Sequence, residues 1–203
     1  MFQVRFHGRG GQGVVTAAEM LSVAAFHEGK QAQAFPVFGS ERMGAPVMSF
    51  CRIDNREIRL RDPVYEPDAL IVQDPTLLQS PDLFAGLKED GFVLVNSARD
   101  VDDVVPLTIV ERLPVGHVLT VQGTELALKH FKRPMPNAAM LGGLVAMTEN
   151  LKLSSITAAI RHAFSGAIGE ANVAAASEAF DIVAAKKLER EIATRKNKEA
   201  IAC

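Results

Sequence analysis

The sequence predicts one α/β domain, a three-layer Rossmann-like fold with a mostly parallel sheet, a local antiparallel hairpin and a long C-terminal helix. Three observations favour this class. A strand-like segment, a glycine-dense turn and an apolar helical run follow one another at the start of the chain. The runs Ala69–Val72 and Phe92–Val95 are continuously apolar, which is typical of strands covered on both faces. Helical patterns alternate with strand-like segments over the rest of the chain.

The first strand and helix enclose the most informative turn. Residues 2–6 read as the strand, His7-Gly-Arg-Gly-Gly-Gln-Gly13 as the turn and residues 14–26 as the helix. Gly8, Gly10 and Gly13 fit the pattern G-x-G-x-x-G, and Gly11 adds a fourth glycine. Glycine reaches positive φ at little cost and lets the backbone approach a ligand closely, while the helix N-terminus offers free N–H groups to a phosphate. The turn therefore predicts a phosphate site, although the same glycines could serve only close packing of strand against helix.

One half of the dinucleotide-binding signature is absent. Dinucleotide folds place an Asp or Glu about 20 residues past the turn, where it binds the ribose hydroxyls. The corresponding end of the expected second strand carries Ala34, Phe35 and Pro36 instead. This disfavours tightly bound NAD or FAD and leaves open a phosphate-bearing ligand that needs no ribose-chelating acid.

The middle of the chain reads as further strands joined by turns. Residues 30–38 are expected to form a second strand, and the loop 39–44 follows it. The runs 46–53 and 57–60 flank Asp54-Asn55, a turn pair that predicts the antiparallel hairpin. Asp74-Pro75 has the acidic cap and early proline of a helix start, and this helix is expected to run to about Lys88.

The second half continues the alternation. Residues 108–110 fit either a short strand or a loop. Gly142 and Gly143 lie inside an expected helix, where each costs about 1 kcal/mol relative to alanine, so another element should approach closely there. Strands are expected at 92–95 and 117–121, and helices at 124–130, 138–147 with Asn137 as cap, 154–164 with Ser154 as cap, and from Ala171 to the end.

The last 18 residues differ in composition from the rest. Past Ala185, charged residues dominate, with pairs such as Lys187–Glu191 one helical turn apart. We expect a main domain over residues 1–185 and a charged C-terminal helix extension over residues 186–203. The extension reads as a solvated helix end, and a docking arm for another subunit is the alternative.

Composition limits the classes of function. The 203 residues carry a formal net charge of −2, which gives no electrostatic reason to expect nucleic acid. No apolar run approaches the roughly 20 residues that cross a bilayer, and the N-terminus shows no secretory pattern. We therefore expect a cytoplasmic protein that binds neither nucleic acid nor membrane. Cys51 and Cys203 form no C-x-x-C, so no local zinc or iron–sulfur site is expected, and Cys51 reads as a small buried hydrophobe.

Few residues near the turn could perform acid–base chemistry. His7 could approach a phosphate, or it could be a strand-end residue held by a backbone carbonyl. Gln12 can hydrogen-bond a ligand but cannot transfer protons. Ser40 and Arg42 lie on the loop after the second strand, which should flank the turn, and arginine binds phosphate or carboxylate bidentately. This set favours a subunit that binds and positions a ligand, with no catalytic residue and no metal ligand of its own.

The combined motifs resemble a known family. Gly8-Arg-Gly-Gly-Gln-Gly-Val14 opening a helix, Ser40-Glu-Arg-Met-Gly44 on the next loop, a strand followed by Asp74, and Asn137 opening a Gly-Gly helix are similar to the gamma subunit of 2-oxoacid:ferredoxin oxidoreductases. Members act on pyruvate, branched-chain 2-oxoacids, 2-oxoglutarate, indolepyruvate or phenylglyoxylate. The resemblance covers nearly the whole chain up to the charged extension.

The resemblance implies a division of labour among subunits. Enzymes of this family decarboxylate a 2-oxoacid on thiamine diphosphate, pass electrons through iron–sulfur clusters and deliver the acyl group to coenzyme A. Thiamine diphosphate and the clusters would belong to alpha, beta and delta partners, with a further flavoprotein where the acceptor is NAD. This chain would help to bind coenzyme A. The implied binding residues are Gly8, Gly10, Gly11, Gln12 and Gly13, with Ser40, Arg42 and Asn96 nearby.

Two other readings stay open. The chain could be a purely structural assembly subunit of that complex with no ligand of its own. It could also be a free-standing nucleotide-binding oxidoreductase, which the missing acid and the missing acid–base residues disfavour. Asn96, which follows a strand, could be only a turn residue.

Overall fold

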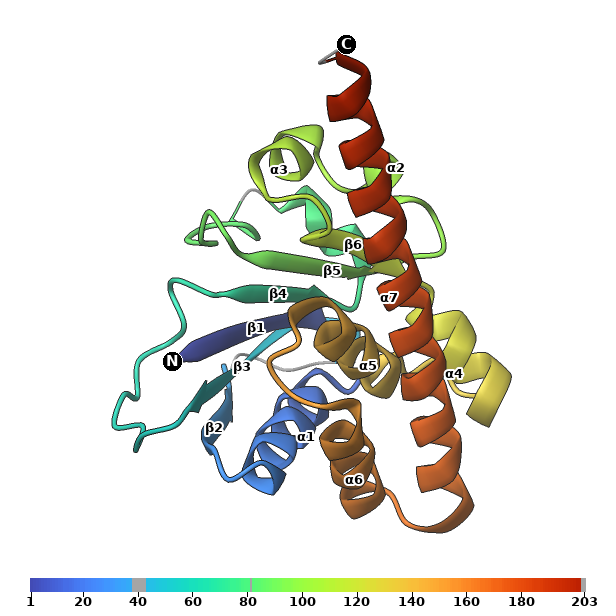
Figure 1. The fold of residues 1–203 in the computed structure, drawn as a ribbon. Helices are drawn as coiled ribbons and strands as arrows, with labels where there is room; N and C mark the ends of the chain where they lie inside the picture. The colour runs from blue at the N-terminus through green and yellow to red at the C-terminus, as the bar shows by residue number, and fades with distance from the viewer. Residues whose placement is uncertain (38–42, 81, 202–203) are drawn as a thin grey trace.

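Six strands form one sheet in the order β2-β3-β1-β4-β5-β6 in the computed structural model, which describes residues 1–37, 43–80 and 82–201 (Figure 1). β1 pairs in parallel with β4, which continues in parallel through β5 to β6. On its other side β1 pairs antiparallel with β3, and β3 pairs antiparallel with β2. The bounds are β1 Phe2–Arg9, β2 Gln31–Pro36, β3 Pro46–Asp54, β4 Ala69–Val72, β5 Phe92–Asn96 and β6 Val118–Val121.

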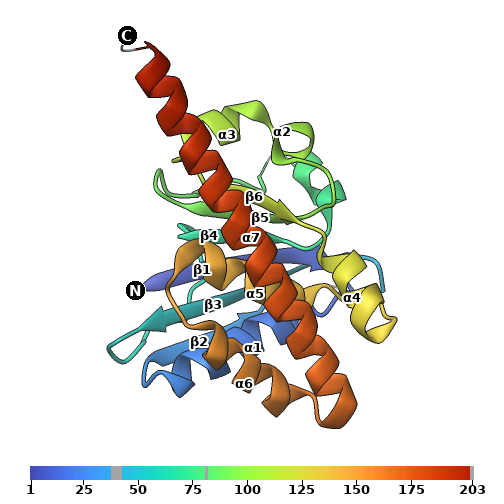
Figure 2. The same cartoon turned by 45° about the vertical axis from the view of Figure 1, so that its right-hand side comes forward.

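Helices cover both faces of the sheet and confirm the three-layer architecture. The longer ones, α1 (Val14–His27), α5 (Asn137–Thr148), α6 (Leu153–Ala163) and α7 (Gly166–Ile201), pack against one face, and α7 runs obliquely over α5 (Figure 2). The opposite face carries the 3-10 helix η1 (Pro75–Gln79) and the short helices α2 (Val101–Val104) and α3 (Leu107–Arg112). α4 (Gly123–Phe131) packs against α7 and α5.

Alternation along β1 separates the two cores. Val4 and Phe6 are fully buried in the cluster beneath α1 and α5. Arg5 and His7 point to the other face, where their parallel neighbours Leu70 and Val72 belong to the second cluster. The sheet therefore separates an extensive apolar core from a smaller one that includes buried polar side chains.

The antiparallel strand lies elsewhere than the sequence predicts. β3 finds its antiparallel partners in β1 and β2, and the segment 57–60 forms no strand. A local turn pair favours pairing with the next run along the chain, but Glu57 and Arg59 are exposed and bond to each other. β3 instead gains a strand partner on each side by inserting between β2 and β1.

Other element boundaries also differ. Asp74 accepts a hydrogen bond from the Thr76 N–H as expected of a cap, yet the helix ends at Gln79, and Gly86 takes a φ of +73°. The segment 101–113 forms α2 and α3, neither the strand nor the loop weighed for 108–110. Three helix starts shift: Pro136 occupies the cap position before Asn137, Lys152 occupies the one expected for Ser154, and α7 begins at Gly166, not Ala171.

Two sequence predictions of packing are confirmed. A side chain at Gly142 would overlap the carbonyl oxygen of Ala176 in α7, so the glycine pair does mark a close approach of helices. Cys51 is fully buried, and burial raises the pKa of its thiol. In the part of the chain that is described, no helix is both long and apolar enough to cross a bilayer.

The beginning of the charged extension is tied to the domain. Lys187 does not pair with Glu191 as expected; its ammonium donates to the Met147 carbonyl and to Glu149, at 3.1 and 2.7 Å. Lys186 donates to the carbonyl of Thr120 at 3.0 Å. α7 continues as one helix through residue 185.

Candidate functional site

The glycine turn lies at the carboxyl edge of the parallel strands and is held by the segment that leads into β3. The Gly10 N–H donates to the Ala45 carbonyl at 2.9 Å, and the Gly44 N–H donates to the Gly10 carbonyl at 3.2 Å. Gly11 and Gly13 then take φ angles of +96° and +71°, where other residues are strained. These angles lead the chain out of β1 and into α1.

Each glycine of the turn meets a different environment. A Cβ on Gly8 would lie 2.6 Å from Val14 and 2.9 Å from the Gln12 side chain, so this glycine serves internal packing. A Cβ on Gly13 would lie 2.5 Å from Nδ2 of Asn137, at the start of α5. A Cβ on Gly11 would have no atom of the described residues within 4 Å. Close packing therefore explains Gly8 and Gly13, whereas Gly11 faces open space.

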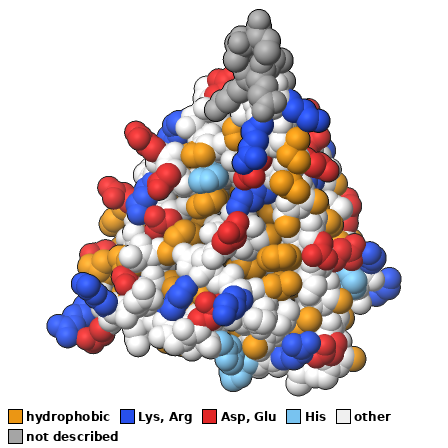
Figure 3. Space-filling view, in the orientation of Figure 1, with side chains coloured by type: hydrophobic (Ala, Val, Ile, Leu, Met, Phe, Trp, Pro, Cys, Tyr) orange, Lys and Arg blue, Asp and Glu red, His pale blue; other side chains and the backbone are white. Residues whose placement is uncertain are grey.

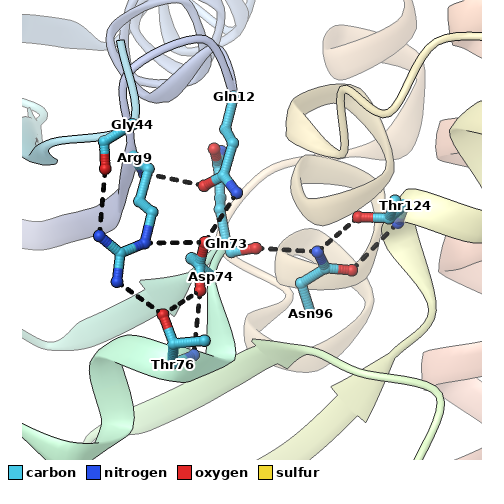
Figure 4. Close-up of polar contacts among 8 residues, drawn as sticks. All are labelled: Arg9, Gln12, Gly44, Gln73, Asp74, Thr76, Asn96 and Thr124. Carbon is cyan, nitrogen blue, oxygen red and sulfur yellow. Dashed lines mark hydrogen bonds and ion pairs between the residues drawn. The ribbon is translucent and has the colours of Figure 1, made fainter. Parts of the chain in front are cut away.

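A polar clamp fixes the turn from below (Figure 4). Asp74 accepts from Nε2 of Gln12 at 3.0 Å and from the Thr76 N–H at 3.0 Å, and it pairs with Nε of Arg9 at 3.2 Å. Arg9 also donates to the Gly44 carbonyl at 3.1 Å and to the Thr76 hydroxyl at 2.8 Å. Burial raises the pKa of Asp74, but the hydrogen bonds from Thr76 and Gln12 and the charge of Arg9 outweigh it and lower the pKa overall.

Gln12 is fully engaged within this clamp. Its side-chain Oε1 accepts from the backbone N–H of Arg9 at 2.8 Å, and the backbone N–H of Gln12 donates to the Arg9 carbonyl at 3.1 Å. By contrast, no described residue accepts a hydrogen bond from the N–H of Gly11 or Gly13. No side chain among the described residues caps α1 at Val14, so the N–H groups of its first turn have no capping partner in that part of the chain. The groups available to a ligand are therefore backbone N–H groups.

Three helix N-termini meet at this edge of the sheet. Gly13 touches Asn137 at the start of α5, and Gly123 at the start of α4 lies beside Asn96. Asn96 at the end of β5 donates to the Thr124 hydroxyl and accepts from the Thr124 N–H, at 2.8 and 3.0 Å (Figure 4). The partial positive charges of α1, α4 and α5 thus point to one region, which favours an anion.

The structure brings most of the predicted residues together. Gly8, Gly10, Gly11, Gln12 and Gly13 form the turn, and Asn96 lies on the same edge, with its amide bonded to the Gln73 carbonyl and to Thr124. Ser40 and Arg42 lie outside the described residues. Sequence reasoning missed the clamp function of Arg9 and of Asp74, which it identified only as a helix cap. It also missed that Asn137 lies against Gly13, because nothing local in the sequence relates two residues so far apart.

Nε2 of His7 is not held by a backbone carbonyl of the described residues, which is one of the two environments considered for it. The side chain is only 8% exposed on the face opposite α1, and Nε2 has no hydrogen-bond partner among the described residues. Burial, with a smaller contribution from the charge of Arg5, lowers the pKa of His7 to about 3. The imidazole is therefore neutral near pH 7.

The fold and the site define a class: Rossmann-like α/β subunits that present a glycine turn and converging helix N-termini at the carboxyl edge of the sheet. A model of the pyruvate ferredoxin/flavodoxin oxidoreductase family matches residues 3–182. The chain belongs to this family and corresponds to its gamma subunits. It serves as the gamma subunit of a multi-subunit 2-oxoacid:ferredoxin oxidoreductase.

Individual relatives agree over almost the whole domain. The chain is 49% identical to the pyruvate/ketoisovalerate oxidoreductases common subunit gamma of Thermococcus kodakarensis, over 89% of this chain and 96% of that protein. It is 46% identical to pyruvate synthase subunit PorC of Methanocaldococcus jannaschii, with the same coverage. The crystal structure of a pyruvate oxidoreductase subunit from Thermotoga maritima superposes with a TM-score of 0.75 at 38% identity, covering 89% of this chain and 95% of that one.

Proposed function

We propose that this subunit binds coenzyme A through the glycine turn, so that its complex converts a 2-oxoacid to an acyl-CoA. The observation that carries the proposal is the contrast within the turn. Its side chains are bonded to one another, while the N–H groups of Gly11 and Gly13 have no acceptor among the described residues, and no described atom would lie within 4 Å of a Cβ on Gly11. Such backbone N–H groups at a helix N-terminus suit the phosphates of coenzyme A.

The sheet topology supports this ligand over a dinucleotide. In a dinucleotide fold the strand that carries the ribose-binding acid lies next to the first strand. Here β3 separates β2 from β1, and β2 ends in Ala34-Phe35-Pro36. The ribose of NAD or FAD would find no carboxylate beside the turn, whereas coenzyme A bound by its phosphates needs none.

In this proposal the bond-breaking steps belong to partner subunits. Alpha, beta and delta subunits would carry thiamine diphosphate, which supplies the chemistry of decarboxylation, and the iron–sulfur clusters; a flavoprotein would join where the acceptor is NAD. A 2-oxoglutarate:ferredoxin oxidoreductase from Magnetococcus marinus, solved with coenzyme A and succinyl-CoA bound, contains a region of the same fold, with a TM-score of 0.70 at 16% identity over 90% of this chain and 31% of that one. It supports coenzyme A as a ligand of such complexes.

The turn residues then have distinct roles. Gly11 and Gly13 donate hydrogen bonds from their N–H groups to phosphate, and Gly8 and Gly10 allow the backbone conformation of the turn. Gln12 and Arg9 position the turn through Asp74, and Asn96 holds the start of α4 beside it. Arg42 and Ser40 would also bind phosphate, because their side chains can donate hydrogen bonds to it and they lie on the loop that follows the second strand in the sequence.

Gly11→Ala tests this assignment. The new methyl group would project into the open space where phosphate is proposed, so the KM of the assembled complex for coenzyme A should rise about tenfold, with little change in the KM for the 2-oxoacid. Gly29→Ala is the matched control, because Gly29 also has positive φ, at +72°, and open space around its Cβ, yet lies at the far end of α1. Steady-state kinetics of both variants measure the difference.

Equal coenzyme A dependence in the two variants would favour the purely structural assembly subunit. Arg42→Ala provides a second measurement, because loss of a guanidinium that binds phosphate should also raise the KM for coenzyme A. Both variants should still copurify with their partner subunits.

A further inference from the structure

The segment between β3 and β4 forms an arm at the edge of the sheet opposite the glycine turn. This β3–β4 arm, residues 55–68, contains no helix or strand and projects from the body at the left of Figures 1 and 2. Irregular loops of this length are uncommon in compact domains and are often functional. Ile53 at the end of β3 pairs with Phe2 at the start of β1, which places the arm at the amino edge of β1. The arm is therefore separate from the turn and from the pocket of about 510 Å³ that η1 and β3 line beside it.

The base of the arm is fixed to the domain. Arg52 in β3 is buried, and its guanidinium donates to the carbonyls of Asp62 and Pro63. A Cβ on Gly86 would overlap the Tyr65 carbonyl oxygen, so the backbones of these two segments are in direct contact. A surface that is ordered before binding loses less conformational entropy when a partner docks on it. The arm is therefore suited to present its side chains in a defined place.

Two large side chains with apolar surface are exposed on the arm. Leu60 is 47% exposed and Tyr65 is 70% exposed. A single exposed apolar side chain is normal on a protein surface, but tyrosine and arginine are enriched where proteins bind one another. Tyrosine contributes strongly to such binding because its ring covers a large area with few rotatable bonds. Leu60 and Tyr65 therefore have the character of interface anchors.

The tip of the arm, residues 55–61, is basic. It carries three exposed arginines and one exposed carboxylate, Glu57, which pairs with Arg59 at 2.8 Å. Arg56 and Arg61 form no ion pair with any described residue. Two guanidinium groups at the tip are therefore available to carboxylates of a partner.

The carboxylates at the base of the arm mostly face the domain. The charge of Asp62 raises the pKa of the Arg52 guanidinium, although burial of that guanidinium is the larger effect and lowers it overall. Asp68 pairs with Lys88. Glu66 is exposed and forms no ion pair with a described residue, so one carboxylate at the base stands against the two arginines of the tip.

We propose that the β3–β4 arm docks on a carboxylate-rich surface of another subunit of the oxidoreductase complex, with Leu60 and Tyr65 as its apolar anchors. Guanidinium groups bind carboxylates bidentately, which fixes orientation as well as charge. A second copy of this chain is a poorer partner, because a two-fold contact between arms would place the arginines of one against those of the other. The inference goes beyond coenzyme A binding, since docking at the amino edge leaves the glycine turn open to its ligand.

Charge reversal at the tip tests the proposal in the assembled complex. Arg56→Glu combined with Arg61→Glu should raise the Kd between this chain and its partner subunits about tenfold and lower the NaCl concentration at which they separate. Arg112→Glu combined with Arg133→Glu is the matched control, because it makes the same change of charge at two exposed arginines outside the arm. An increase in Kd for the arm variant no larger than that of the control would overturn the proposal.

Cross-linking identifies the partner without removing the charge, and it serves equally if the reversed variant does not fold. Arg61→Lys keeps a cation at the tip and supplies an amine, which a carbodiimide joins to a carboxylate in direct contact. Mass spectrometry of the purified complex should then show an amide bond between position 61 and an Asp or Glu of a different subunit. A bond only to a second copy of this chain, or none, would reject the docking surface.

Tyr65 allows a measurement on the unsubstituted protein, because it is the only tyrosine of the chain. N-acetylimidazole acetylates exposed tyrosines, so Tyr65 should react in the free chain and at least about fivefold more slowly in the assembled complex, where the partner covers its ring. Equal rates in the two forms would mean that the arm stays exposed after assembly, and the proposal would fail.

Discussion

At the scale of single residues, Asp74 determines the shape of the turn. One carboxylate holds Gln12, Arg9 and the start of η1, and each of those groups in turn bonds to the glycine segment. The sequence predicts Asp74 correctly as a cap because Asp-Pro is a local signal. Its contact with Gln12 spans 62 residues, and only the pairing of β1 with β4 brings the two together.

The titration of Asp74 yields a prediction about stability. The pKa of Asp74 is lower in the folded protein than in the unfolded chain. Its contribution to the free energy of unfolding is therefore fully present above the unfolded pKa of about 3.9 and is lost as the pH falls through the folded pKa. Asp74→Asn should reduce the free energy of unfolding by about 1–2 kcal/mol at pH 7. Urea denaturation should show this deficit shrinking below about pH 4, because Asp74 of the unfolded wild-type chain then binds a proton that the folded carboxylate does not.

The control for this experiment is Asp90→Asn, at an exposed position. Its unfolding free energy should stay within about 0.5 kcal/mol of wild type across the same pH range. A deficit for Asp74→Asn that is constant down to pH 3 would mean that the carboxylate charge does not hold the clamp together.

At the scale of elements, the sequence predicts what is local and errs where distant segments compete. Continuous apolar runs identify β4 and β5, and the glycine turn identifies β1 and α1, because the signal lies within each segment. The hairpin prediction for 46–53 and 57–60 fails because β3 pairs with strands on both sides, and one of these, β1, pairs across a long stretch of chain, from Arg9 with Pro46 to Phe2 with Ile53. The glycine pair in α5 predicts a close approach, but only the fold shows that α7 makes it.

The two glycines of α5 should respond differently to alanine. Alanine favours a helix by about 1 kcal/mol over glycine, so either substitution in an unconstrained helix would stabilise it. At Gly142 the methyl group would overlap the backbone carbonyl of Ala176 in α7. We therefore expect Gly142→Ala to lower the free energy of unfolding by about 1–3 kcal/mol. At Gly143 it would meet the side-chain ends of Leu94 and Val183, which can move. In thermal unfolding, the melting temperature of Gly142→Ala should be well below that of Gly143→Ala. The reverse order would contradict the packing of α5 on α7.

At the scale of the whole molecule, the surface and the extension concern assembly. On the face that Figure 3 shows, acidic and basic side chains are interspersed, which agrees with the small net charge. The candidate site occupies the carboxyl edge of the sheet, so both faces can be covered by helices while that edge stays available to a ligand. Of this arrangement the sequence predicts the edge and the turn; the neighbouring pocket depends on η1 and β3 converging, which no local pattern encodes.

The charged extension provides the last prediction. The match to the family ends at residue 182, yet Lys186, Lys187 and Arg190 bond to Thr120, Met147, Glu149 and Asp102 of the domain. Ending the chain after Ala185 should therefore lower the free energy of unfolding by about 1–3 kcal/mol, chiefly through the partly buried hydrogen bonds of the two lysines. Ending it after Lys196 keeps these bonds and should change stability by less than about 0.5 kcal/mol. Chemical denaturation of both truncated chains measures the contrast. If the shorter chain is as stable as wild type but no longer copurifies with its partner subunits, the extension acts as a docking arm and not as a brace for the domain.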